Sequence, residues 1–302
     1  MSSAMNTHEA LVQDIIAAHA SLALPAAATA PAVFSSDAPV YRAAKQACLA
    51  LGFIEPDAEC LAKAWQRVFE RTGQFKAGAW PDQAADFGIR PWPRDDAFAA
   101  CPRQLGLYAV LPDAAWVVRM ARAGVATVQL RFKSDDARAI DQEVRAAVQA
   151  VQGTDALLFI NDHWQAAIAA GAYGVHLGQE DMEEADLQQI RSAGLRLGLS
   201  SHGYAEMLHA DSFSPSYIAL GAVFPTTLKR MVTAPQGTGR LGAYASLMRD
   251  YPLVAIGGID SSRLPEVLAS GVGSVAVVRA LVAAEHPEAM AASLQAAISA
   301  KA

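Results

Sequence analysis

The sequence predicts an α/β fold, a (β/α)₈ TIM barrel that carries a small N-terminal helical extension. From residue 105 onward, eight short apolar runs alternate with alanine-rich segments of helical period. Several runs, such as ALLFI and VAVV, are continuous, as expected for parallel strands that are covered on both faces. An open doubly wound sheet is the competing fold, but no GxGxxG follows the first run, and eight βα units exceed what that fold needs.

The N-terminal part of the chain is predicted to be helical. Its strongest segment, residues 57–72, carries an apolar stripe formed by Leu61, Ala64, Trp65, Val68 and Phe69. Asp57 can cap the start of this helix, and Gly73 can end it.

Two weaker helices are expected over residues 8–22 and 38–51, with an Ala/Pro/Ser-rich loop over 25–39. We therefore assign residues 1–72 to a helical extension of unknown role. Residues 73–104 are rich in Pro and Trp, and their composition favours a linker.

Residues 105–302 are assigned to the barrel. Strands are expected over residues 107–111, 127–132, 156–161, 174–177, 196–200, 217–220, 253–256 and 274–278. Intervening helices are expected over segments such as 114–123, 135–151, 185–193 and 261–269, which usually end at or near a glycine.

The composition excludes several classes of partner. The chain has 24 basic and 30 acidic residues, a net charge of −6 and a pI near 5.6, which offers no footprint for nucleic acid or an anionic membrane. Cys48, Cys60 and Cys101 lack CxxC spacing, so a reducing compartment is expected. We find no signal peptide pattern, and no apolar run approaches the roughly 18 residues of a membrane span. We expect a cytoplasmic protein, and the sequence leaves a homo-oligomer possible.

Candidate site residues follow the predicted strands, because the chemistry of a TIM barrel lies at the carboxyl ends of its strands. Strand two ends with Gln129, Arg131 and Lys133, which alternation places on one side of the pleat. Two cations and an amide are therefore expected to converge.

Two carboxylates follow the next two strands. Asp162 comes directly after strand three, and Asp181 lies in the segment GQED after strand four. Hard oxygen ligands of this kind suit Mg²⁺, which takes one or two carboxylates together with water and substrate phosphates. A helix N-cap is the alternative for either residue alone.

Later strand ends add hydroxyls, a histidine and glycines. Strand five ends in Ser200, followed closely by His202, and a long loop after strand six resembles a substrate lid. Strand seven runs into Gly257 and Gly258, where backbone N–H groups can close on a phosphate, with a tight turn as the alternative. The sequence thus offers two anion sites but no Cys or activated Ser that stands out as a nucleophile. This combination indicates a group-transfer reaction in which a diphosphate is the leaving group.

The barrel segments closely resemble thiamine-phosphate synthase, also called thiamine-phosphate pyrophosphorylase. The resemblance is carried, in order and over residues 105–302, by VQLRFK, FINDHW, YGVHLGQED, GLSSHG, ALGAVFPTTLK, APQG, VAIGGID and VGSVAVVRA. It implies a transferase that joins 4-amino-2-methyl-5-(diphosphooxymethyl)pyrimidine to a (carboxy)hydroxyethylthiazole phosphate, giving thiamine phosphate and pyrophosphate. The family reaction is dissociative, so that pyrophosphate leaves before the thiazole nitrogen attacks.

The resemblance also implies roles for individual residues. The pyrimidine diphosphate would be held by Gln129, Arg131, Lys133, Asn161, Ser200 and Lys229. Arg131, Lys133, Ser200 and Lys229 would be the catalytic group, and Mg²⁺ would bind Asp162 and Asp181. The thiazole phosphate would be bound by the loops that contain Thr226, Thr227, Leu228, Gly258, Val278 and Arg279.

The sequence departs from the family pattern at two places. Thr226-Thr227-Leu228-Lys229 replaces the Thr-Glu-Thr-Lys of many members, and Arg279 stands where a serine is expected. A thiazole tautomerase with His202 as acid/base and a non-catalytic phosphate-binding regulator are the alternative functions. The intact metal carboxylates argue against both.

Overall fold

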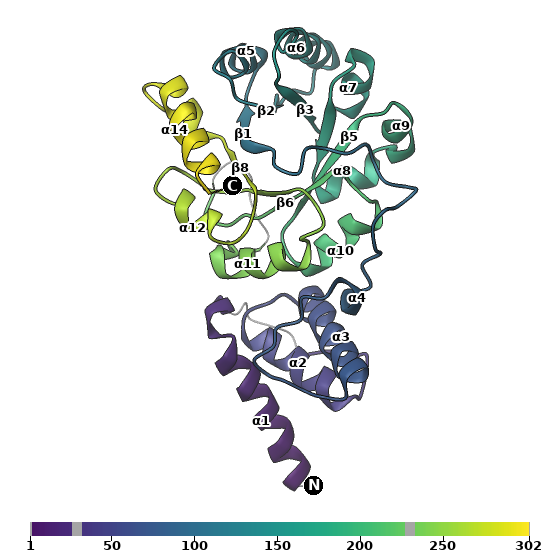
Figure 1. Ribbon diagram of the computed structural model, residues 1–302. Coiled ribbons are helices and arrows are strands. Elements are labelled where there is room, and N and C mark those ends of the chain that lie inside the picture. Colours follow the sequence, from purple (N-terminus) through teal and green to yellow (C-terminus); the bar gives the residue numbers. More distant parts are fainter. Residues whose placement is uncertain (1, 26–31, 227–232, 302) are drawn as a thin grey trace. The chain divides into compact units, whose positions relative to one another are not determined.

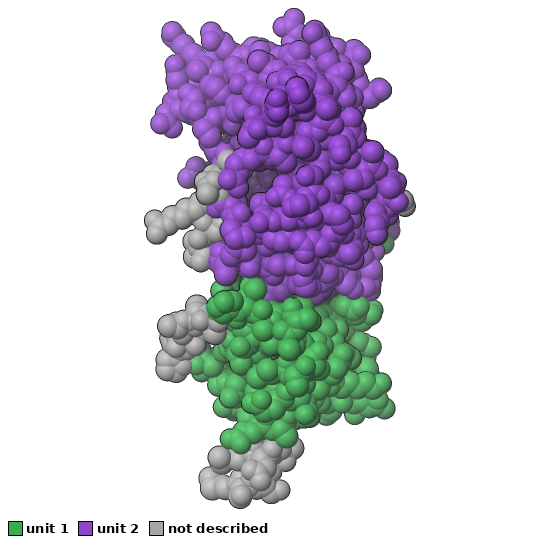
Figure 2. All heavy atoms as spheres, turned by 90° about the vertical axis from the view of Figure 1, so that its left-hand side faces the viewer, with its two compact units in different colours: residues 1–92, 203–212 green, residues 93–202, 213–302 purple. Residues whose placement is uncertain are grey.

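The structure, a computed structural model, describes residues 2–25, 32–226 and 233–301. It divides into two compact units, coloured separately in Figure 2. Unit 1 comprises Met1–Trp92 together with Gly203–Ser212, and unit 2 comprises Pro93–His202 together with Phe213–Ala302. The division after Trp92 falls inside the segment predicted to be a linker.

Unit 1 is a bundle of helices. They are α1 (Ser2–Ala18), η1 (Ala20–Leu22), α2 (Pro39–Ala50), α3 (Glu55–Thr72), α4 (Ala84–Phe87) and α10 (Tyr204–Ser212). The helix predicted over 57–72 is present and ends at Gly73, which adopts the left-handed conformation with φ 68°. Its buried stripe includes Leu61 and Trp65.

Asp57 does not cap α3, in contrast to the prediction. The residue before α3 is Ile54, which makes no side-chain cap, and Asp57 already lies within the first turn. Its Oδ1 instead accepts a hydrogen bond of 2.8 Å from the backbone N–H of Ala205, in the first turn of α10. A carboxylate at a helix N-terminus satisfies an otherwise unpaired N–H and interacts favourably with the helix dipole. Asp57 therefore caps a helix that is remote in sequence.

A charged cluster lies between α2 and α3, and we call its five members the Lys45 cluster: Ser35, Tyr41, Lys45, Glu55 and Glu59. The Lys45 side chain is 2% exposed, and its Nζ lies 2.5 Å from Glu59 Oε2 and 2.7 Å from Glu55 Oε1. Glu59 also accepts hydrogen bonds of 2.5 Å from the Ser35 and Tyr41 hydroxyls.

The pKa values of this cluster are strongly shifted. Burial alone would lower the pKa of Lys45, but hydrogen bonds to Glu55 and Glu59 outweigh it and raise the pKa. Burial alone would raise the pKa of Glu59, but hydrogen bonds from Lys45, Ser35 and Tyr41 lower it to about 2. Both groups are therefore held in their charged forms.

Unit 2 confirms the predicted barrel. Its sheet is closed, with all neighbouring strands parallel and in sequence order (Figure 1). The strands are β1 (Gly106–Leu111), β2 (Thr127–Leu130), β3 (Leu157–Asn161), β4 (Gly174–Leu177), β5 (Arg196–Ser201), β6 (Tyr217–Leu220), β7 (Leu253–Ala255) and β8 (Ser274–Val277). Each bound lies within about two residues of the prediction, as is usual for element ends.

Helices cover the outside of the barrel. They are α5 (Ala114–Arg122), α6 (Ala137–Ala150), α7 (Trp164–Ala170), α8 (Gln179–Glu184), α9 (Leu187–Ser192), α11 (Gly237–Leu247), α12 (Leu264–Leu268), α13 (Arg279–Val282) and α14 (Pro287–Ser299). Asp113 caps α5 through the N–H of Trp116, and Asp136 caps α6. Among the described residues, no helix is long and apolar enough to span a membrane.

The interior of the barrel combines large rings with small side chains. Tyr108, Phe159 and Tyr217 pack together, with ring centroids 5.2–5.9 Å apart. Ala219 and Ala276 belong to the same buried cluster but fill little volume. The barrel is therefore packed around the three rings, whereas the small residues leave space next to them.

Candidate active site

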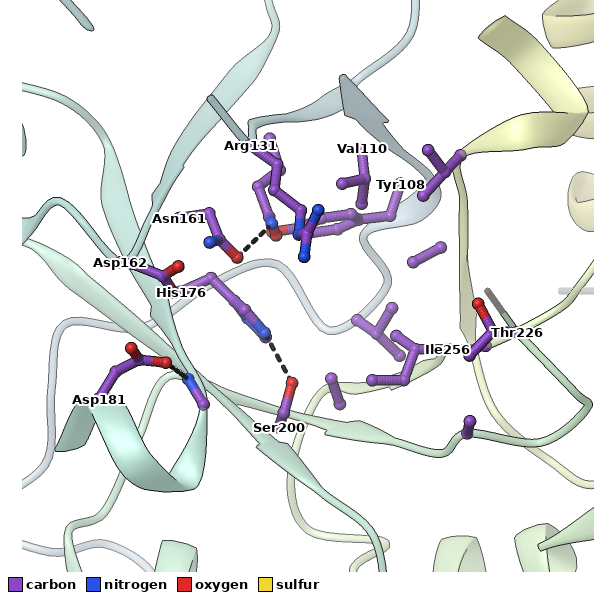
Figure 3. A pocket seen from close by; sticks show the side chains of 18 of the residues that line it. Tyr108, Val110, Arg131, Asn161, Asp162, His176, Asp181, Ser200, Thr226 and Ile256 are labelled. Carbon is purple, nitrogen blue, oxygen red and sulfur yellow. Dashed lines mark hydrogen bonds between the residues drawn. The ribbon is translucent and has the colours of Figure 1, made fainter. Parts of the chain in front are cut away.

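A cavity of about 360 Å³ opens at the carboxyl ends of the barrel strands (Figure 3). Every strand contributes to its lining, through Tyr108, Gln129, Asn161, His176, Ser200, Ala219, Val254 and Ala276 in strand order. Most polar and charged lining residues come from β2 to β5 and the segments that follow them, together with Tyr108 of β1 and Tyr217 of β6. Val254 and Ile256 make the β7 side apolar. The site therefore offers hydrogen bonds on one side and an apolar wall on the other.

The polar side is a continuous chain of hydrogen-bonded side chains, which we call the floor chain: Asn161, Gln129, Tyr108, Tyr217, His176 and Ser200. Gln129 Nε2 donates to Asn161 Oδ1 over 3.0 Å, and Tyr108 donates to Gln129 Oε1 over 2.9 Å. The two tyrosine hydroxyls lie 2.7 Å apart. His176 then joins the chain to Ser200.

The histidine uses both ring nitrogens. Its Nδ1 lies 2.7 Å from the Tyr217 hydroxyl, and its Nε2 lies 2.8 Å from Ser200 Oγ, the latter bond being drawn in Figure 3. Burial raises the pKa of both Tyr108 and Tyr217, so their hydroxyls stay protonated. The floor chain therefore consists of neutral hydroxyl and amide groups around one imidazole.

A glycine in β5 makes room for this arrangement. A Cβ at Gly198 would lie 2.1 Å from Tyr217 Cζ, which is far closer than atoms pack in proteins. The absence of a side chain at Gly198 therefore lets the Tyr217 ring lie against the barrel wall, with its hydroxyl between Tyr108 and His176.

Charged residues form the rim of the cavity. Strand β2 ends at Leu130, so Arg131 follows the strand instead of belonging to it as predicted. Arg131 and Lys133 still line the cavity with Gln129. Lys133 is exposed, and its Nζ lies 2.5 Å from Asp162 Oδ2. The rim thus brings together the cations after β2 and the carboxylate after β3.

Asp162 and Asp181 lie on the same side of the cavity (Figure 3). Asp162 does not cap α7, whose preceding residue is His163, and its backbone adopts a positive φ of 64°. Asp181 is not an N-cap either, because Gly178 holds that position and Asp181 is the third residue of α8. Its Oδ2 accepts a hydrogen bond of 3.1 Å from the N–H of Gly178. One carboxylate thus pairs with a lysine, and the other stabilises the start of α8.

The residues expected to bind the thiazole phosphate lie in different places. Thr226 and Val278 line the cavity, together with Gly257. Gly258 is not part of this lining, and its carbonyl accepts a hydrogen bond of 2.5 Å from Arg263. Arg279 is exposed at the start of α13 and is also absent from the lining. Thr227, Leu228 and Lys229 lie outside the described residues.

Sequence reasoning gave no role to Tyr108, His176 and Tyr217, which form the middle of the floor chain. Each lies inside an apolar run, in LYAVL, GVHL and YIAL, and reads there as a core residue. Hydrogen-bonding side chains within strands that otherwise bury only apolar groups were the available signal.

Comparisons with known proteins agree with the motifs. The family model described as thiamine monophosphate synthase matches residues 107–281. The thiamine-phosphate synthase of Neisseria meningitidis serogroup A is 55% identical over 192 residues, which are 64% of this chain and 94% of that protein. The same enzyme of Yersinia pestis strain Pestoides F is 51% identical over 187 residues, which are 62% of this chain and 87% of that protein.

A solved structure gives the same result. Thiamine phosphate pyrophosphorylase from Pyrococcus furiosus superposes with a TM-score of 0.59 at 28% identity, covering 66% of this chain and 98% of that one. These findings confirm the resemblance that the barrel motifs indicated.

Proposed function

Because the chain belongs to the thiamine monophosphate synthase family, we propose that it joins an aminopyrimidine diphosphate to a thiazole phosphate, giving thiamine phosphate and pyrophosphate. One observation carries the proposal beyond family membership. Polar and charged side chains at or just after the carboxyl ends of four consecutive strands, β2 to β5, converge on one cavity that also has an apolar wall. Such a cavity fits a flat ring that bears a charged tail.

The rim cations are suited to the diphosphate. Arg131 and Lys133 line the cavity, and the guanidinium group can form two parallel hydrogen bonds with phosphate oxygens. In the proposed reaction, the bond between the pyrimidine methylene carbon and the diphosphate oxygen breaks, and its electron pair leaves with the diphosphate. Fixed cations stabilise the charge that develops there. Lys229 is proposed to add a third cation from the loop after β6.

The carboxylates Asp162 and Asp181 are proposed to hold Mg²⁺. Among the described residues, no group of three or more His, Cys, Asp or Glu side chains is placed to hold a metal. The two rim carboxylates instead suit a site that substrate phosphates complete, which is the usual form for Mg²⁺. The contact between Lys133 and Asp162 supports this, because it is a pairing that a divalent cation can replace. When bound, Mg²⁺ would neutralise diphosphate charge and so stabilise the leaving group.

The thiazole phosphate is proposed to bind near Thr226, Gly257 and Val278, which line the cavity. The residues that follow these three in sequence, Thr227, Leu228, Gly258 and Arg279, are proposed to belong to the same site. The thiazole nitrogen then donates its lone pair to the pyrimidine methylene carbon, forming the new C–N bond. The apolar wall formed by Val254 and Ile256 keeps water from competing for that carbon. A cytoplasmic location and a homo-oligomer remain predictions.

The direct test supplies the pyrimidine diphosphate, the thiazole phosphate and Mg²⁺ to the purified protein, and measures thiamine phosphate by thiochrome fluorescence. We expect product that depends on both substrates and on Mg²⁺. Asp162→Ala and Asp181→Ala are expected to lower kcat at least a hundredfold, since each removes a proposed metal ligand. Asp260→Ala is the matched control, because Asp260 caps its own loop and does not line the cavity.

Folded protein that gives no product would overturn the proposed function. Near-normal turnover by both Asp162→Ala and Asp181→Ala would overturn the metal site alone.

A further inference from the structure

The floor chain has a direction, because each of its groups has a limited number of protons to donate. An amide oxygen only accepts hydrogen bonds, whereas a tyrosine hydroxyl donates one proton and accepts others. The Tyr108 hydroxyl therefore donates its one proton to Gln129 Oε1. The 2.7 Å contact between the tyrosines must then be donated by Tyr217.

The same count of donated protons determines the tautomer of His176. Once Tyr217 has donated to Tyr108, its oxygen can only accept from His176 Nδ1 over their 2.7 Å contact. The proton of a neutral imidazole then resides on Nδ1, and Nε2 is left as an acceptor. Ser200 must therefore donate to His176 Nε2.

From this count we propose that Tyr108 and Tyr217 are positioning residues that hold His176 as the neutral Nδ1–H tautomer, and thereby make Ser200 Oγ a hydrogen-bond acceptor toward the cavity. Every hydrogen bond of the floor chain is then donated in the same direction, from Ser200 toward Asn161. Tyr108 and Tyr217 are each at most 2% exposed, so water does not substitute for their hydroxyls. The direction of the hydrogen bonds in the floor chain is therefore set by residues of the barrel core.

The two ends of the chain face the ligand with opposite character. The Ser200 hydroxyl donates its proton to His176, so its oxygen can only accept a hydrogen bond from a ligand. Asn161 uses Oδ1 to accept from Gln129, so its Nδ2 donates. Both residues line the cavity. The floor therefore selects a flat ring that offers an N–H to Ser200 and a lone pair to Asn161.

An aminopyrimidine has this combination, with an exocyclic amine beside a ring nitrogen. This part of the inference rests on the proposed function and makes it more specific. The corresponding 4-oxopyrimidine places an acceptor where the amine was, and would direct a carbonyl oxygen at the Ser200 lone pairs. A site built to pair a donor rejects such an analogue strongly, because its own polar group is left unpaired.

The tautomer can be measured without any substrate. The full chain, labelled with ¹⁵N-histidine, has seven histidines, and the His176 signals are those lost in His176→Gln. We expect long-range ¹H–¹⁵N spectra to show a protonated Nδ1 and an unprotonated Nε2 for His176. In Tyr217→Phe, Nδ1–H loses its acceptor, and we expect the signals to move toward a mixture of both tautomers.

The consequence for specificity is measured by comparing kcat/KM for the 4-amino and 4-oxo pyrimidine diphosphates. We expect the native chain to prefer the amino substrate by at least about a hundredfold. Tyr217→Phe and Tyr108→Phe are expected to reduce that preference about tenfold, the usual effect of one hydrogen bond. A role confined to stability would not change this ratio.

Tyr251→Phe is the matched control. Tyr251 is also buried in the barrel unit and its hydroxyl also has a hydrogen-bond partner, Arg94 at 2.8 Å, but it does not line the cavity. This variant is expected to change stability without changing the His176 signals or the substrate preference.

The outcomes separate the two proposals. An Nε2–H tautomer or a doubly protonated ring in the native chain overturns the proposed direction, and so does a Tyr217→Phe variant with unchanged tautomer and preference. A native chain that shows the expected tautomer but makes no thiamine phosphate overturns the proposed function and leaves the tautomer assignment intact.

Discussion

Two of the buried polar networks in the described residues, the Lys45 cluster and the floor chain, differ in charge and in where they end. The Lys45 cluster of unit 1 is charged, and its central groups, Lys45 and Glu59, are satisfied by neighbours within the same helical unit. The floor chain of the barrel is a row of hydroxyl and amide groups around an imidazole, and its end residues, Asn161 and Ser200, line a cavity.

The Lys45 cluster is therefore expected to stabilise the fold, whereas the floor chain is expected to bind a ligand. Charges buried in unit 1 are strongly destabilising if one partner is lost, because the other remains uncompensated. Polar groups that open onto a cavity add less to stability, but they are ordered before a ligand arrives. Variants of unit 1 should therefore change the free energy of unfolding, and variants of the floor chain should change substrate preference.

The largest expected effect on stability is that of Lys45→Met. The substitution keeps most of the volume of the side chain but leaves Glu59 without its buried cation, at a cost of about 3 kcal/mol. Urea denaturation measures the loss, and kcat/KM is expected to stay unchanged. Lys63→Met is the control, because Lys63 pairs with the same Glu59 at 3.1 Å but is 52% exposed. Its expected cost is below about 1 kcal/mol, and an equal cost for both variants would contradict the contrast.

The second effect is a loss of stability in acid. The pKa of Glu59 in the folded chain is about 2, below its ordinary value of 4.5. A lowered carboxyl pKa contributes stability above pH 4.5, and this contribution is lost as the pH falls from there toward 2. We expect about 2 kcal/mol over this range, allowing for partial exposure of the carboxylate.

Unfolding free energies measured at several pH values test this expectation. Glu59→Gln should remove the corresponding part of the pH dependence. An unchanged slope in this variant would mean that other carboxylates cause the acid sensitivity.

The smallest of the three effects is that of Asp57→Ala. This substitution removes the acceptor for the N–H of Ala205 at the start of α10, and loss of a helix cap costs about 1 kcal/mol. Asp57→Asn keeps an acceptor and should recover most of the loss. Thermal unfolding monitored by circular dichroism distinguishes the two variants. Equal destabilisation by both would show that the charge matters and that the hydrogen bond does not.

The barrel was predictable because its signals are local. The strands are short apolar runs, most of which follow a turn that contains a glycine, and this pattern does not depend on the rest of the chain. The cavity-lining residues Arg131, Lys133, Asp162 and Asp181 could be selected from the sequence for the same reason, since each lies at or shortly after the end of such a run.

Features that depend on contacts remote in sequence were not predictable. Asp57 has the residue type and position of a cap for its own helix, but its partner, Ala205, lies 148 residues away. Tyr108 and Tyr217 are separated by 109 residues, and only barrel closure brings their hydroxyls together. Local patterns therefore indicated which residues border the site, but not how the barrel core orders their protons.

The membership of α10 in unit 1 has a consequence for how the chain is organised. This helix lies in sequence between β5 and β6, yet it is grouped with the N-terminal helices, and Asp57 of α3 caps it. The backbone therefore crosses from one unit to the other after Trp92, His202 and Ser212. Neither unit is a contiguous stretch of the gene, so no single cut releases the N-terminal helices with all of their packing partners. Segments of the two units therefore alternate along the sequence.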